Sequence, residues 1–291
     1  MRKENTKDTV VVYHADCFDG FTAAWAAWKK LGNDAEYIPF SRYGDFPILK
    51  NKKVYIVDYC PETTEDIKKL IQNNKKLVII DHHVSEAEVI KSAPEHVFNT
   101  KHSGAFLAWQ YFHSKAPVPE LVKYVQDYDL WSFKLSGTRE VINMIGFQDL
   151  KKATFENWSE IDRILSNKSQ KKKYLEKGDI IENYKGIIFR DIIDNQTQKV
   201  EFEGYKVLAT NCPRIFRSEI GNLLAKKNPP FAIVWSQTSK KTVVSLRGVG
   251  DFDVTKIAEK YPGGGGHKSA SAFSFPLGTP LPWKVIKEDE T

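Results

Sequence analysis

The chain has 291 residues, of which 41% are apolar and 12% are aromatic, and it carries a formal net charge of +6. This length suffices for two domains with separate cores, and the apolar fraction is typical of a soluble globular protein. No apolar run approaches the ~20 residues that cross a bilayer, and the first residues are charged, unlike a signal peptide. Its cysteines (Cys17, Cys60 and Cys212) lie far apart and indicate a reducing compartment without a disulfide framework. We therefore expect a cytoplasmic protein that does not bind a membrane.

The first half of the chain alternates short apolar runs with helical patterns. Strands are expected at residues 9–14, 35–40, 53–57, 76–80 and 95–98. The run at 77–80 is apolar without alternation, as in a strand that is buried on both faces of a parallel sheet. This order predicts a doubly wound, mainly parallel α/β sheet.

The second half begins with helical patterns, from about 139 to 187, and then changes to short strands. The expected strands are 187–189, 199–202, 205–209, 231–235, 242–246 and 270–275, with helices at 214–226 and 253–260. We therefore predict two α/β domains, the first over 1–166 and a smaller one over 188–291, joined by a helical linker over 167–187.

Acids and imidazoles follow the ends of three predicted strands in the first domain. Because the carboxyl ends of parallel strands meet at one edge of a sheet, we expect these side chains to form one site. Each of them alone would be an ordinary helix cap or surface group, so the prediction depends on their repeated placement. They are His14, Asp16, Asp19, Asp58, Asp81, His82 and His83, with Asp127 further along at the end of a predicted helix.

Mixed carboxylate and imidazole ligands suit Mn²⁺, with Mg²⁺, Fe²⁺ or Co²⁺ as alternatives. A bridging carboxylate can hold two such ions ~3.5–4 Å apart. A pair of ions lowers the pKa of a bridging water and neutralises a phosphoryl group during in-line attack. Phosphate ester hydrolysis is therefore the reaction that this residue pattern favours.

A second feature lies in the smaller domain, where Pro262 precedes four glycines and His267. A glycine run is weak evidence alone, but it can form a backbone nest that approaches an anion closely. Arg247, at the end of a predicted strand, can bind a phosphate bidentately. Together they predict that this domain holds the far end of a phosphorylated substrate.

These motifs, in this order, resemble the DHH phosphoesterase family: His14-x-Asp16-x-x-Asp19-Gly20, then Asp58, Asp81–His82–His83 and Gly264–Gly265–Gly266–His267. That family pairs a metal-bearing domain with a smaller substrate-binding domain that carries a Gly-Gly-Gly-His signature, and the resemblance covers nearly the whole chain. The segments 127–131 and 138–141 look like the nanoRNase subgroup, which degrades very short RNA from the 3′ end with Mn²⁺.

The resemblance also implies a role for each residue. Asp58 would bridge two ions, one also bound by His14 and the other by Asp19, His82 and Asp127. Asp81 would orient its neighbours, either from behind the metal ligands or as an additional ligand. His83 would contact the scissile phosphate and stabilise its charge or help protonate the leaving oxygen. The substrate phosphate or terminal nucleotide would be bound by Arg247, Gly264, Gly265, Gly266 and His267, with Ser103 as a further phosphate contact.

Two ligand positions stay open at this point. The family has an acid where this chain has Cys17, while Asp16 lies one residue earlier; Asp16 is slightly favoured, and a cysteine would favour softer metals. Asp129 competes with Asp127, which is preferred because it keeps the spacing to Leu130–Trp131.

The resulting functional hypothesis is a Mn²⁺-dependent phosphodiesterase that releases 5′-mononucleotides from short RNA or linear dinucleotides. Alternatives are a hydrolase of cyclic dinucleotides, of 3′-phosphoadenosine 5′-phosphate or of pyrophosphate, a single-strand DNA exonuclease, and a nucleotide-binding module that has lost its metals. The net charge permits an anionic partner without demanding one. The oligomeric state stays open, with a homodimer as one option.

Overall fold

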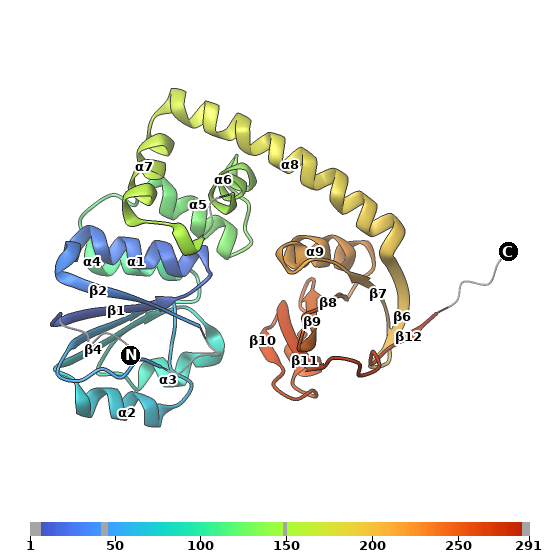
Figure 1. Ribbon diagram of the computed structural model, residues 1–291, viewed down its shortest axis with the longest axis horizontal. Coiled ribbons are helices and arrows are strands. Elements are labelled where there is room, and N and C mark those ends of the chain that lie inside the picture. Colours follow the sequence, from blue (N-terminus) through green and yellow to red (C-terminus); the bar gives the residue numbers. More distant parts are fainter. Residues whose placement is uncertain (1–6, 42–45, 148–149, 287–291) are drawn as a thin grey trace. The chain divides into compact units, whose positions relative to one another are not determined.

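The computed structural model describes residues 7–41, 46–147 and 150–286. The chain forms two compact units, Met1–Glu182 and Asn183–Thr291. The division falls inside α8 (Lys168–Gln196), a helix of 29 residues that includes the segment expected to link the domains (Figure 1).

The first unit is built on a parallel sheet of five strands in the order β2-β1-β3-β4-β5. The chain passes from β1 to β2 on one side of it and then to β3 on its other side. The direction of winding therefore switches between β1 and β3. This confirms the expected doubly wound sheet. The strands are β1 (Thr9–His14), β2 (Ala35–Phe40), β3 (Lys53–Val57), β4 (Lys76–Asp81) and β5 (Glu95–Phe98).

Helices cover both faces of this sheet (Figure 1). The apolar residues of β4 from Leu77 to Ile80 are all buried, as expected for a strand between two helical layers. On one face lie α1 (Phe18–Leu31) and α4 (Gly104–Phe112), with α5 (Glu120–Asp129), α6 (Thr138–Gly146) and α7 (Phe155–Ser166) joining the same core. On the other face lie α2 (Thr64–Asn73) and α3 (Ala87–Lys91).

The core beside α1 explains that helix's composition. Its alanines are fully buried and let the helix approach the sheet closely, while Trp25 fills the space toward α7. The Trp25 indole N–H donates to Ser159 Oγ at 2.9 Å, and the Trp158 N–H donates to Thr22 Oγ1 at 2.9 Å. Trp25 is therefore a core residue, because its ring is 1% exposed and its polar atom is satisfied.

The second unit is a mixed sheet of seven strands, in which only β7 and β8 are parallel neighbours. The core on one face includes α9 (Arg217–Lys227) and the core on the other includes α10 (Thr255–Ala258). The strands are β6 (Thr197–Phe202), β7 (Tyr205–Asn211), β8 (Phe231–Gln237), β9 (Lys241–Gly248), β10 (Gly265–His267), β11 (Ala270–Pro276) and β12 (Lys284–Val285).

The strand expected at residues 187–189 is wrong, because these residues belong to α8. Phe189 and Ile192 are buried against α9, whereas Ile187 is exposed. This is the three-residue spacing of one helical face rather than the alternation of a strand. Within the described ranges, no helix combines the length with the apolar character that a membrane span requires.

Candidate metal centre

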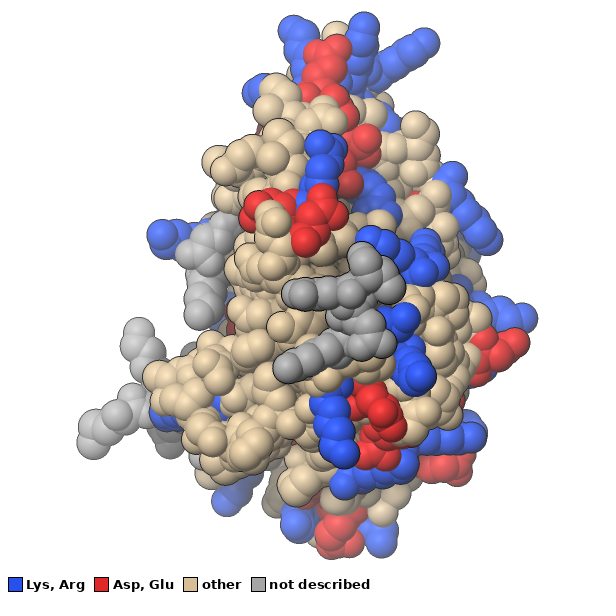
Figure 2. Space-filling model, turned by 90° about the vertical axis from the view of Figure 1, so that its right-hand side faces the viewer, with Lys and Arg blue, Asp and Glu red and all other residues tan. Residues whose placement is uncertain are grey.

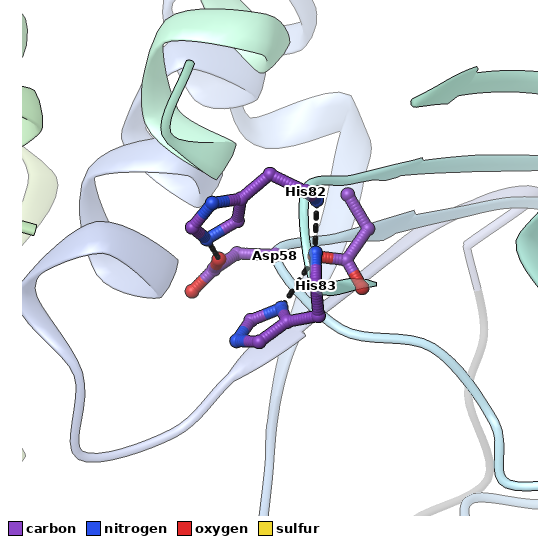
Figure 3. Close-up of side chains that lie close together, drawn as sticks. Asp58, His82 and His83 are labelled. Atoms are coloured by element: carbon purple, nitrogen blue, oxygen red, sulfur yellow. Dashed lines mark hydrogen bonds and ion pairs between the residues drawn. The ribbon is translucent and has the colours of Figure 1, made fainter. Parts of the chain in front are cut away.

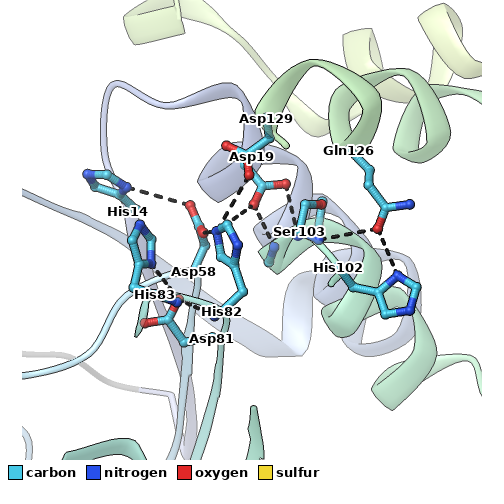
Figure 4. Close-up of polar contacts among 12 residues, drawn as sticks. His14, Asp19, Asp58, Asp81, His82, His83, His102, Ser103, Gln126 and Asp129 are labelled. Carbon is cyan, nitrogen blue, oxygen red and sulfur yellow. Dashed lines mark hydrogen bonds and ion pairs between the residues drawn. The ribbon is translucent and has the colours of Figure 1, made fainter. Parts of the chain in front are cut away.

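The acids and imidazoles at the ends of β1, β3 and β4 converge in the first unit (Figure 4). His14 ends β1, Asp58 follows β3, and His82 follows β4. Asp19 comes from the first turn of α1 and Asp129 from the last turn of α5. The centre therefore lies at the carboxyl edge of the sheet, beside the point where the winding switches direction.

Asp58 is the central residue of this cluster. Its side chain is 1% exposed, and among the described residues neither of its carboxylate oxygens has a hydrogen-bond partner. His14 Nδ1 lies 3.6 Å from Oδ2, and His82 Nε2 lies 3.4 Å from Oδ1. Burial alone would raise the pKa of Asp58, but its contacts with the two imidazoles hold that pKa below its usual range. A buried carboxylate with two unsatisfied oxygens is costly unless a cation lies against it, so the residues present fit a bound metal.

Asp19, His82 and Asp129 form a second group that shares His82 with Asp58. His82 Nε2 lies 3.8 Å from Asp19 Oδ2 and 3.5 Å from Asp129 Oδ2. The Asp19 carboxylate also accepts the backbone N–H groups of Gly104 at 2.6 Å and Ala105 at 3.0 Å, at the start of α4. One carboxylate thus anchors the N-terminus of a helix and faces the centre.

The close approach of α4 explains a glycine beside the centre. A Cβ atom on Gly104 would lie 2.6 Å from Asp58 Oδ1, nearer than a real Cβ atom approaches. Glycine at this position therefore allows the helix to start directly against the Asp58 carboxylate.

Asp81 and His83 form a pair at the edge of the centre (Figure 4), and the rings of His83 and His82 lie 4.6 Å apart (Figure 3). Asp81 Oδ1 lies 2.7 Å from His83 Nδ1 and accepts the backbone N–H of His82 at 2.7 Å. This pairing fixes the His83 ring so that Nε2 is the nitrogen directed away from Asp81. Burial alone would lower the pKa of His83, but the hydrogen bond with Asp81 raises it to about 9.

The protonation of the cluster follows from its three acids, of which Asp19 and Asp58 are buried. Burial alone would lower the pKa of His82, but Asp58, Asp129 and Asp19 raise it to about 10. Burial raises the pKa of Asp129 to about 6. The attraction of His82 opposes this rise, and the repulsion from Asp58 adds to it. Without metal the centre therefore holds protons that a bound cation would displace.

We expect the free energy of unfolding of the metal-free protein to fall as the pH rises from about 7 to about 10. Below the ordinary histidine pKa of 6.5, folded and unfolded chains both carry the proton, so the stabilisation of protonated His82 and His83 is complete. It is lost as the pH rises through the folded pKa values of about 10 and about 9. Urea unfolding of chelated and Mn²⁺-loaded protein at several pH values measures this slope.

The metal-loaded protein should show a flatter profile, since the cation takes the place of the proton on His82. The substitution H82Q should flatten the profile of the chelated protein, whereas H96Q, at an exposed histidine on β5, should leave it unchanged. Equal slopes for wild type and H82Q would contradict this assignment.

The structure corrects the choice of Asp127. Its Oδ1 accepts the N–H of Lys134 at 2.8 Å, and its Oδ2 accepts the N–H of Leu135 at 3.1 Å and the hydroxyl of Thr138 at 2.6 Å. Asp127 thus holds the turn between α5 and α6. Its rival Asp129 is the acid that faces His82, so Asp129 takes its place in the candidate ligand set.

The structure also decides between Asp16 and Cys17. Asp16 adopts a positive φ of 54° and its side chain is exposed. Ligand atoms of His14, Cys17 and Asp58 lie within 4.8 Å of one another. The slight preference for Asp16 is therefore wrong, and Cys17 is the residue that faces the centre.

Ser103 is not placed as a phosphate contact. It is 0% exposed, and its hydroxyl caps α4 by accepting the Phe106 N–H at 3.3 Å. Its own N–H donates to Gln126 Oε1, which also lies 3.1 Å from His102 Nδ1 (Figure 4). The serine is therefore part of the support for the helix that carries Gly104.

The residues expected to bind substrate in the second unit remain a prediction. The Arg247 guanidinium donates to Ser218 Oγ at 3.0 Å. Gly264 and Gly266 are required by the backbone, because a Cβ would lie 1.8 Å from the Ala258 carbonyl in the first case and φ is +143° in the second. Gly265 borders open space and His267 is exposed, so these two are accessible from solvent.

Comparison with known proteins adds a fold assignment. No family model matches the chain. An uncharacterized protein of Acanthamoeba polyphaga mimivirus is 28% identical over 295 residues, which cover 91% of this chain and 67% of the viral protein.

Two solved structures share the fold at 13% identity. An exopolyphosphatase-related protein from Bacteroides fragilis matches with a TM-score of 0.52 over 92% of this chain and 87% of its own. RecJ from Thermus thermophilus, solved in complex with Mn²⁺, matches with a TM-score of 0.53 over 92% of this chain, which spans about half of RecJ (49%). The chain therefore shares the two-domain α/β fold of these two structures.

Proposed function

We propose that the chain is a metal-dependent phosphodiesterase that hydrolyses short RNA oligonucleotides, including linear dinucleotides, from the 3′ end to 5′-mononucleotides. The observation that supports this most strongly is Asp58, a fully buried carboxylate whose unsatisfied oxygens lie between two imidazoles. Such a carboxylate is suited to bridge two divalent ions.

The donor set divides into two halves around Asp58. His14 and Cys17 lie on one side, and Asp19, His82 and Asp129 lie on the other. Mn²⁺ is the proposed cofactor because carboxylate and imidazole ligands dominate, and the RecJ structure with the same fold was solved with Mn²⁺. When bound, two such ions supply an acidified water and offset the charge of the phosphoryl group.

His83 is the side chain that we assign to the scissile phosphate. Asp81 holds its Nδ1, so its Nε2 is the atom that stabilises a phosphoryl oxygen or gives a proton to the leaving oxygen. In the metal-free protein the hydrogen bond with Asp81 raises the pKa of His83 to about 9, and this bond favours the protonated form that a proton donor requires.

An aromatic turn that follows Asp129 favours a substrate with a base. The rings of Trp131 and Phe133 lie 4.9 Å apart, and the ring of Tyr128 lies 5.5 Å from that of Trp131. The Arg139 guanidinium lies 4.2 Å from the centre of the Phe133 ring. Partly exposed aromatic faces of this kind can stack a nucleobase, whereas pyrophosphate offers nothing to stack.

The backbone of this turn is held in an uncommon conformation. Trp131 and Phe133 both have positive φ values, 54° and 48°. Bulky residues rarely adopt this region, and such strain concentrates at functional sites. We therefore place the stacking function on these two rings.

The formal net charge of +6 permits a short anionic substrate without requiring an extended basic groove. Figure 2 shows one face of the molecule, on which Lys and Arg side chains are interspersed with acidic and uncharged surface. A long single strand is usually tracked by a continuous basic groove. A dinucleotide or a short oligomer needs only a few phosphate contacts.

A substrate panel tests the proposal. Purified protein with Mn²⁺ is incubated with 5′-labelled RNA of two to five residues, DNA of the same lengths, cyclic dinucleotides, 3′-phosphoadenosine 5′-phosphate, pyrophosphate and a long single-stranded DNA. We expect the fastest turnover on the short RNAs, with stepwise loss of 5′-mononucleotides from the 3′ end. Faster turnover of another substrate would assign the same centre to that alternative, and no turnover with metal bound would leave a binding module.

Truncation of the aromatic turn should separate binding from chemistry. We expect W131A to raise KM for a dinucleotide by about tenfold, which corresponds to the ~1–3 kcal/mol that stacking of one base contributes. Turnover of a small phosphodiester without a nucleobase should stay within about twofold. F147A, at another exposed aromatic residue of the same unit, should change neither value. An unchanged KM in W131A would argue against the stacking role.

A further inference from the structure

We propose that Cys17 is a thiolate ligand in the half of the centre formed with His14 and Asp58, and that it gives this half a preference for Zn²⁺ or Co²⁺ over Mn²⁺ and Mg²⁺. The inference deepens the proposed function, since it requires that the centre bind metal. It assigns a different metal preference to each half.

The position of Cys17 supports this assignment. Cys17 precedes α1 with φ −129° and ψ 135°, and its side chain makes no capping hydrogen bond with the helix. Its backbone carbonyl instead accepts the Phe21 N–H at 3.0 Å. Its sulfur lies within 4.8 Å of ligand atoms of His14 and Asp58, so the thiol faces the centre from the start of the helix.

A second observation, independent of the cysteine, marks the same space as a cation site. Asp58 is 1% exposed, and neither of its oxygens has a hydrogen-bond partner among the residues described. The nearest alternative ligand in sequence, Asp16, is exposed. One sulfur, one imidazole nitrogen and one carboxylate oxygen thus converge on the same point.

The chemistry of these three donors differs from that of the other half. Asp19, His82 and Asp129 offer two carboxylates and one imidazole, which suit Mn²⁺. A thiolate is a soft ligand and selects softer ions such as Zn²⁺, and Zn²⁺ and Co²⁺ also bind more tightly than Mn²⁺ at most sites.

The acids around Cys17 keep its proton in place until a cation arrives. Burial raises the pKa of the Cys17 thiol, and the charges of Asp58, Asp129 and Asp19 raise it further, although a hydrogen bond from the Gly20 backbone opposes the shift. A cation in the site reverses this effect, so we expect binding to release the thiol proton to solvent.

Cobalt gives a direct test, because a thiolate bound to Co²⁺ produces a charge-transfer band in the near ultraviolet that carboxylates and imidazoles do not. Chelator-treated full-length protein is titrated with Co²⁺ and followed by absorbance. We expect the band in wild type and in C212A, a control at a buried cysteine of the second unit. We expect no band in C17S or C17D, although both variants should still bind cobalt.

Competition between metals gives a second readout. We expect C17D, which restores a carboxylate, to shift the relative affinity for Zn²⁺ over Mn²⁺ toward Mn²⁺ by at least about tenfold, measured as bound metal by elemental analysis. Circular dichroism and thermal unfolding establish that the variants are folded.

The outcomes separate this inference from the proposed function. A wild-type protein that binds cobalt without the band, or a C17S protein that keeps it, would refute the thiolate ligand and leave the phosphodiesterase proposal standing. If wild type bound no cobalt and no manganese, the metal centre itself would be wrong, and both proposals would fail.

Discussion

Replacement of Asp58 by asparagine should lower turnover of a dinucleotide by about a thousandfold, which corresponds to about 4 kcal/mol of transition-state stabilisation. Asparagine keeps the size of the side chain but removes the negative charge that lies between His14 and His82. We expect the bound metal to fall from two ions per chain to one or fewer. Elemental analysis and steady-state kinetics measure the two effects, and circular dichroism should show the wild-type fold.

The matched control is D34N, which removes an exposed acid just after the C-terminal end of α1, whereas Asp19 lies in the first turn of that helix. It should change neither turnover nor metal content. If D58N kept both ions and most of its activity, the bridging role of Asp58 would be untenable.

The neighbouring acids Asp127 and Asp129 should show opposite effects. D129N removes a carboxylate that lies 3.5 Å from His82 Nε2, so we expect turnover to fall at least about a hundredfold with little change in stability. D127N disrupts a buried carboxylate that accepts three hydrogen bonds in the turn to α6, so we expect a loss of about 3 kcal/mol in the free energy of unfolding. Urea unfolding and metal titration measure both variants.

The folded fraction of D127N should bind metal within about threefold of wild type, because hydrogen bonds and not ions hold this carboxylate. The reverse result, with D127N losing metal and D129N losing only stability, would restore Asp127 to the ligand set.

Much of the centre could be predicted from the sequence because parallel strands bring their carboxyl ends together. His14, Asp58 and His82 each follow an apolar run, and strand pairing alone places them at one edge. The orienting role of Asp81 was implied by the family resemblance, and the structure places Asp81 Oδ1 2.7 Å from His83 Nδ1. A residue at the end of a strand can be placed as soon as the strands of the sheet are identified.

The remaining ligands depend on orientation, which the sequence does not encode locally. Asp127 and Asp129 stand two positions apart on one helix and therefore point roughly 200° apart, so the structure of the following turn decides which of them faces the sheet. Asp16 and Cys17 precede α1, and the positive φ of Asp16 directs its side chain to solvent. The sequence feature that pointed to Cys17 was its position, where the resembling family has an acid.

A comparable ambiguity affected the second unit. Residues 187–189 are three successive apolar residues, a pattern that fits a strand when taken alone. The apolar residues at 192 and 193 extend the pattern by a helical turn, and burial of Phe189 and Ile192 against α9 shows the helical face. A longer window would have favoured the helix.

The anchoring of Asp19 has a consequence for how the protein obtains its cofactor. The N–H groups of Gly104 and Ala105 hold this carboxylate, and the backbone N–H of His82 holds Asp81, so protein atoms alone fix these two acids. The empty and filled forms should then share one backbone, and ion entry requires no refolding. Such a preformed receptor exchanges ions quickly, and its occupancy follows the supply of each metal in its surroundings.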